Sequence, residues 1–143
     1  MQIVLADDDT DDCNFFKEAL EELTIDTILK IVHDGVQLMK YLLQEGTQVP
    51  DVLFLDLNMP LKNGMECLFE IKQHEGLKQL PVIMYTTSIN GNIITRLQEL
   101  GATYCIKKPA EFSQLKKILN ISLDLLSTGK EGKAREAFVL SLD

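Results

Sequence analysis

Residues 51–64 read DVLFLDLNMPLKNG, and this stretch predicts how the rest of the chain is arranged. Four apolar residues, Val52 to Leu55, have the length of a buried strand and are followed directly by Asp56. An unpaired carboxylate is costly inside a sheet, so Asp56 is expected at the carboxyl-terminal end of that strand. The turn that follows contains Pro60, which restricts the backbone, and Gly64, which is expected to supply positive φ. The stretch therefore predicts one acid on a stiff loop at the rim of a sheet.

The composition predicts a soluble globular protein of one domain. The chain has 143 residues, 45% of them are hydrophobic, and the formal net charge is −8. This acidity opposes binding to nucleic acid or to anionic membranes, because both carry negatively charged phosphates. No apolar run is long enough to cross a bilayer, and no signal sequence is recognised. Three widely spaced cysteines without a CxxC pair predict buried thiols in a reducing cytoplasm rather than disulfides or a zinc site.

Strand and helix patterns alternate along the chain. Apolar strands are predicted at 3–6, 27–32, 52–55, 82–85 and 103–106, each followed by a helix, at about 11–23, 36–43, 64–73, 93–100 and 111–126. Strands that are apolar throughout indicate a parallel sheet covered by helices on both faces. With right-handed crossovers, the pattern predicts an α/β fold with a doubly wound, five-stranded parallel sheet.

Polar residues follow four of the predicted strands. The acids at 7–9 come after the first strand, Asp56 after the third, Thr86 after the fourth and Lys108 after the fifth. Ligands of doubly wound sheets bind at this edge, where the strand order reverses. Clustered carboxylates without histidine or cysteine suit a hard cation such as Mg²⁺. Such an ion would leave one Asp56 oxygen free to attack phosphorus, while Lys108 and the Thr86 hydroxyl would stabilise the phosphoryl oxygens.

Four segments resemble the receiver domain of two-component response regulators. They are IVLADDD, DLNMPLKNG, PVIMYTTS and IKKPAEF, at or after the first, third, fourth and fifth strands, in that family's order and spacing. The resemblance covers residues 1–126 and implies a flavodoxin-like (βα)5 fold. It also implies a stand-alone, chemotaxis-regulator-like protein, which is a switch that catalyses only its own phosphorylation and dephosphorylation rather than an enzyme.

The resemblance assigns roles to individual residues. Asp56 would accept a phosphoryl group from a histidine kinase or phosphotransfer protein. Lys108 would be the cation and Thr86 the switch hydroxyl that contact the phosphoryl oxygens. Backbone N–H groups of the loops near Asn58 and Thr87 would donate further hydrogen bonds to these oxygens. The magnesium ion would be held by Asp7, Asp8, Asp56 and the backbone carbonyl of Asn58.

The segment around Lys108 carries two further expectations from the family. Pro109 would set the loop after the fifth strand through a cis peptide bond. Relatives often carry a switch aromatic three residues before the lysine, but here that position is Cys105. The neighbouring Tyr104 should point to the opposite face of the sheet. Activation would therefore use the loop before the fourth helix, or Tyr104 in a shifted register.

Residues 127–143 are expected to be a tail without an output domain. Glycines and alternating charges are typical of a linker, whereas four tail residues are too apolar to be free in water, namely Phe138, Val139, Leu140 and Leu142. Either the tail packs back on the domain, or it forms a dimer or partner contact. The family's contact surface would be the fourth helix, fifth strand and fifth helix, for a downstream protein or for a homodimer.

Three alternative functions compete with this interpretation, and a simpler structural reading applies to some of the acids. The acids between 7 and 18 partly match a calcium-binding EF-hand loop, but Asp12 stands where that loop needs glycine. Asp9, Asp11 and Asp12 are more simply read as solvated acids at a helix start. A dehalogenase-like phosphohydrolase needs a second acid where Asn58 stands. A phosphorylation-independent scaffold would have no need of the acid, threonine and lysine set.

Overall fold

The computed structural model describes residues 1–128 and 137–142 as one parallel sheet with helices on both faces. The strands are β1 Gln2–Ala6, β2 Ile28–Val32, β3 Val52–Leu55, β4 Val82–Thr86 and β5 Tyr104–Lys107. The helices are α1 Thr10–Glu21, α2 Gly35–Leu43, α3 Gly64–Gln73, α4 Gly91–Glu99 and α5 Phe112–Ser127. The sheet order is β2-β1-β3-β4-β5, which confirms the predicted doubly wound (βα)5 fold. Within the described ranges, no helix has both the length and the apolar character needed to span a bilayer.

Helix starts are defined by side-chain caps. The side chains of Asp9, Asp34, Asn63 and Asn90 each accept a hydrogen bond from the backbone N–H three residues on, at the start of α1, α2, α3 and α4. These caps satisfy N–H groups that would otherwise have no partner, so each loop joins its helix in a defined geometry.

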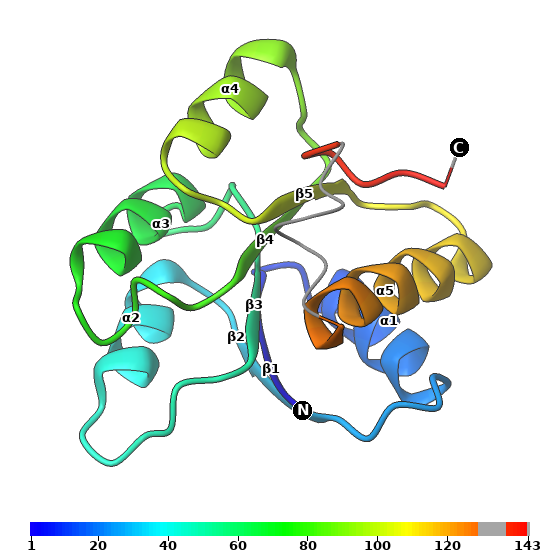
Figure 1. Cartoon of the computed structure of the whole chain (residues 1–143), viewed down its shortest axis with the longest axis horizontal. Helices are drawn as coiled ribbons and strands as arrows, with labels where there is room; N and C mark the ends of the chain where they lie inside the picture. Colours follow the sequence, from blue (N-terminus) through cyan, green and yellow to red (C-terminus); the bar gives the residue numbers. More distant parts are fainter. Residues whose placement is uncertain (129–136, 143) are drawn as a thin grey trace.

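The sheet divides the core into two layers. Figure 1 shows α2, α3 and α4 on one face of the sheet and α1 and α5 on the other. Successive strand residues alternate between the layers: in β1, Val4 and Ala6 pack on the first face, whereas Ile3 and Leu5 pack on the second. Apolar residues of the helices complete each layer, so both faces of the central strands are buried in apolar surroundings. The polar groups lie at the strand ends.

The strand order reverses between β1 and β3, which are neighbours in the sheet. The Asp56 N–H donates to the Ala6 carbonyl at 3.0 Å, and the Asp7 N–H donates to the Val32 carbonyl at 3.0 Å. The first bond holds Asp56 beside the end of β1, and the second ties Asp7 to the end of β2, so both acids lie at the carboxyl edge. The switch point of the sheet is therefore lined by carboxylates.

The end of the chain returns to the sheet. Val139 forms a parallel bridge with Cys105 at the outer edge of β5, and Phe138 is buried in the layer of α2, α3 and α4. Figure 1 shows this segment, in red, beside β5. The expectation that the apolar tail residues pack back on the domain is confirmed for Phe138, Val139 and Leu140. It is wrong for Leu142, which is 41% exposed. The linker expected around Gly129 and Gly132 lies outside the described residues.

Candidate functional site

Three carboxylates meet at the switch point. One oxygen each of Asp7, Asp8 and Asp56 lies within 4.8 Å of the others. Asp7 and Asp56 are buried and Asp8 is exposed, so the cluster has one side open to solvent. Burial raises the pKa of Asp7 to about 6, the charge of Asp56 acts in the same direction, and Lys108 opposes the shift. A bound cation would relieve the repulsion between the three carboxylates, and their oxygen donors suit Mg²⁺ or a similar hard ion.

Lys108 supplies the positive charge of the site. Its Nζ lies 2.7 Å from Asp7 Oδ2 and 3.2 Å from Asp56 Oδ2, and its side chain is only 8% exposed. The ammonium also lies 5.4 Å from the centre of the Tyr85 ring. Burial alone would lower the pKa of Lys108, but its close contacts to the Asp7 and Asp12 carboxylates and the charge of Asp56 raise it. The lysine is therefore a permanent cation beside the Asp56 carboxylate.

Thr86 is the last residue of β4 and is fully buried. Its hydroxyl accepts a hydrogen bond from the Ser88 N–H at 3.3 Å, and its carbonyl accepts one from the Lys108 N–H at 2.9 Å. The second bond ties the end of β4 to the loop that carries the lysine. The structure thus brings the predicted acids, hydroxyl and ammonium to one edge of the sheet.

Asp12 is a member of this site that the sequence interpretation missed. Its Oδ2 lies 2.9 Å from Lys108 Nζ, although it was expected to be a solvated acid at the start of a helix. One signal could have identified it: Asp12 precedes the buried Phe16 by four residues, so both lie on the inward face of α1. Asp8 and Asp11, by contrast, are exposed.

In the loop between β3 and α3, the backbone at Gly64 lies very close to the backbone of Asp56. The Gly64 N–H donates to the Leu57 carbonyl at 2.8 Å, and a Cβ at Gly64 would lie 2.1 Å from the Asp56 carbonyl oxygen. The expectation that Gly64 supplies positive φ is wrong, because the residue with positive φ in this loop is Leu61, at 68°. Gly64 is required because the α3 start packs against the backbone of Asp56. Asn58 lies in this loop, two residues after Asp56.

Two expectations around β5 have different outcomes. Tyr104 packs in the layer of α1 and α5 and Cys105 in the opposite layer, as predicted from strand alternation. The cis bond expected before Pro109 is wrong, because the described peptide bonds are all trans. Trans is the lower-energy form for a proline bond, and the Lys108 N–H bond to Thr86 fixes the loop without isomerisation.

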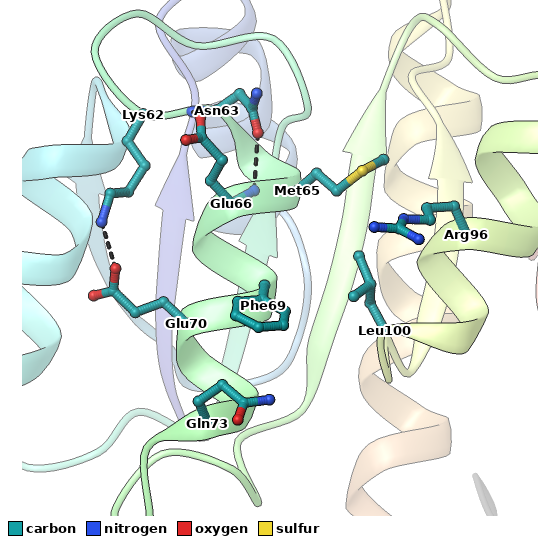
Figure 2. A pocket seen from close by; sticks show the side chains of 9 residues that line it. All are labelled: Lys62, Asn63, Met65, Glu66, Phe69, Glu70, Gln73, Arg96 and Leu100. Carbon is teal, nitrogen blue, oxygen red and sulfur yellow. Dashed lines mark hydrogen bonds and ion pairs between the residues drawn. The ribbon is translucent and has the colours of Figure 1, made fainter.

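An open groove between α3 and α4 lies apart from these residues. Figure 2 shows Phe69 and Leu100 facing each other across it, with the Lys62 and Glu70 ion pair at one rim. Its volume is about 540 Å³. None of the acid, hydroxyl or ammonium groups of the strand ends lines this groove, so it takes no part in their chemistry.

The chain belongs to the response regulator receiver domain family, whose model matches residues 3–120. It is 36% identical over 121 residues to the response regulator Rcp1 of Synechocystis sp., a match that covers 82% of each protein. It is also 37% identical over 110 residues to the transcriptional regulatory protein CpxR of Escherichia coli, which covers 76% of this chain and 43% of CpxR.

Solved structures agree with the family assignment. The phosphorylated cyanobacterial phytochrome response regulator RcpA is 36% identical with a TM-score of 0.82, covering 90% of this chain and 94% of that one. The Mn²⁺-bound form of Rcp1 is 34% identical with a TM-score of 0.76, covering 95% of each chain. The chain is therefore a two-component response regulator receiver domain, and its acid cluster fits the divalent metal binding of a relative.

Proposed function

We propose that this chain is a single-domain response regulator that accepts a phosphoryl group on Asp56 and signals through protein contact. The donor is a histidine kinase or a phosphotransfer protein. The observation that carries this proposal is the buried ion pair between Lys108 Nζ and Asp56 Oδ2, at 3.2 Å, beside the carboxylates of Asp7 and Asp8. It is supported by the relative RcpA, which has been solved in a phosphorylated form.

The proposed step is a direct transfer between a phosphohistidine and Asp56. A bond forms between one Asp56 oxygen and phosphorus while the phosphorus–nitrogen bond of the donor breaks. The electron pair of that bond stays on the donor nitrogen, and because the other ring nitrogen carries a proton, the histidine leaves as neutral imidazole. Lys108 and the Thr86 hydroxyl then stabilise the phosphoryl oxygens on Asp56. The protein catalyses only this self-phosphorylation and its own dephosphorylation, in which water takes the phosphoryl group from Asp56, and it has no separate substrate to turn over.

We propose that Mg²⁺ is the ion used in this reaction. Its ligands are the carboxylates of Asp7, Asp8 and Asp56 and the backbone carbonyl of Asn58. The ion supplies positive charge that offsets the acids and the incoming phosphoryl oxygens. The carboxylate cluster and the Mn²⁺-bound form of the relative Rcp1 support this assignment.

The proposed output is a contact made by α4, β5 and α5, including the tail that lies on β5. A downstream protein is the expected partner, and a homodimer through the same surface or through the tail is the second arrangement. A cytoplasmic location is proposed with it, because the three cysteines are free and buried, as in a reducing compartment.

Intact mass after incubation with acetyl phosphate tests the proposal. Wild type should gain one phosphoryl group in the presence of Mg²⁺ and none in its absence, and Asp56→Asn should gain none. Asp51→Asn is the matched control, because Asp51 precedes the same strand at its opposite end and should be modified like wild type. Modification of Asp56→Asn would refute the site. No modification of wild type, without Mg²⁺ binding, would favour a phosphorylation-independent scaffold.

A further inference from the structure

Asp12 contacts the same ammonium group that pairs with Asp56. Lys108 Nζ lies 2.9 Å from Asp12 Oδ2, a distance between those to Asp7 and to Asp56. Asp7 has a proposed role in metal binding and Asp56 is the proposed acceptor, but neither role includes Asp12. Its carboxylate is thus an additional counter-ion for Lys108 inside the site.

Local structure holds Asp12 in this place. The Asp12 N–H donates to Asp9 Oδ1 at 3.0 Å, which fixes the first turn of α1. The next residue, Cys13, is buried, and its thiol donates to the Asp7 carbonyl at 3.3 Å. The helix N-terminus favours a negative side chain at Asp12. The side chain of Asp12 is 37% exposed whereas that of Lys108 is 8% exposed, so the pair lies at the rim of the site.

We propose that Asp12 is a positioning residue that competes with the phosphoryl group for Lys108. This inference rests on the proposed function of Asp56. Phosphorylation places new anionic oxygens beside the lysine, and the ammonium has only three hydrogens to donate. Contacts to these oxygens must therefore be made at the expense of its contacts to Asp7, Asp12 and Asp56. Asp12 stabilises the unmodified arrangement and lowers the affinity of the site for a phosphoryl group.

Beryllofluoride, a phosphoryl analogue, tests this competition in the presence of Mg²⁺. Titration calorimetry should show that Asp12→Asn binds it roughly threefold to tenfold more tightly than wild type, the range for losing a partly exposed charge-assisted contact. Asp11→Asn is the matched control: it removes the same charge from the same helical turn, at an exposed residue. It should bind like wild type, and Asp12→Glu should return the affinity toward the wild-type value.

A double-mutant cycle with Lys108→Ala separates competition for the lysine from simple charge repulsion. In the Lys108→Ala background, Asp12→Asn should leave both the beryllofluoride affinity and the rate of modification by acetyl phosphate unchanged. If Asp12→Asn raised the beryllofluoride affinity equally with and without Lys108, the proposal would be overturned. It would also be overturned if Asp12→Asn alone left the beryllofluoride affinity unchanged. Wild type that fails to bind beryllofluoride through Asp56 would instead overturn the proposed function, and the inference with it. Urea unfolding of each variant checks that it is folded.

Discussion

Cys105 and Val139 form a parallel bridge at the outer edge of the sheet, which makes the tail a short extension of that sheet. The Cys105 N–H donates to the Phe138 carbonyl at 3.0 Å, and the Cys105 carbonyl accepts from the Leu140 N–H at 2.9 Å. Phe138 anchors the segment with a side chain that is 8% exposed. The tail thereby covers backbone groups of β5 that would otherwise form an open edge.

Replacing the anchor should release the tail. In Phe138→Ala, the amides of Cys105 and Leu140 should exchange with solvent at least about tenfold faster, because the buried side chain that holds the segment is lost. Stability should fall by at most about 3 kcal/mol, since the tail can detach without unfolding the domain. Hydrogen exchange by NMR measures both amides. Leu142→Ala is the control, because Leu142 is 41% exposed, and unchanged exchange in Phe138→Ala would contradict the anchoring role.

Lys108 should stabilise the metal-free protein. Lys108→Ala removes the cation shared by Asp7, Asp12 and Asp56, so about 3 kcal/mol of unfolding free energy should be lost at pH 8. Urea unfolding in the presence of EDTA measures the loss. Lys107→Ala is the matched control, since Lys107 is exposed at the end of β5, and it should change stability by less than about 0.5 kcal/mol. If Lys108→Ala lost no more unfolding free energy than Lys107→Ala, the buried ion pairs would not contribute to the stability of the protein.

Asp8 should contribute to metal binding without contributing to the buried ion pairs. Asp8→Asn removes one of the three clustered carboxylates and should weaken Mn²⁺ binding at least about tenfold. Electron paramagnetic resonance of free Mn²⁺ measures the dissociation constant directly. Asp11→Asn carries the same charge change outside the cluster and should bind as wild type does. An Asp8→Asn protein with wild-type affinity would remove Asp8 from the ligand set.

The raised pKa of Asp7 gives the metal-free protein a defined pH dependence. The pKa is about 6 in the folded protein against 3.8 ordinarily, so the folded state binds more protons between these values. Below about pH 4, protonated Asp7 adds to the free energy of unfolding. This stabilisation is lost as the pH rises to about 6 and above, and the total loss is about 3 kcal/mol of unfolding free energy. Asp7→Asn should therefore gain stability relative to wild type as the pH rises from 4 to 7.

Urea unfolding with EDTA at several pH values measures this difference. The other acids titrate in both proteins, so subtracting wild type from Asp7→Asn largely removes their contribution. A difference that stays constant from pH 4 to pH 7 would contradict the raised pKa. Saturating Mg²⁺ should reduce the difference, because a bound cation stabilises the ionised carboxylate.

The sequence by itself determined the fold and most of the site. Apolar strands and amphipathic helices are local patterns, and each was found within a few residues of its observed ends. Parallel strands bring all their carboxyl ends to one edge of a sheet. Asp7, Asp56, Thr86 and Lys108 could therefore be grouped from strand-end positions alone, without any knowledge of the strand order.

Only the tertiary structure decided which of these groups make contact. Asp12 and Lys108 lie 96 residues apart, and their ion pair depends on how α1 sits against the sheet. The burial of Phe138 in the layer of α2, α3 and α4 depends likewise on the packing of elements that are distant in the sequence. The need for glycine at position 64 arises from the approach of α3 to Asp56 rather than from its own backbone angle. Such contacts have no periodic signature in the chain, because they form only after the helices and strands have packed.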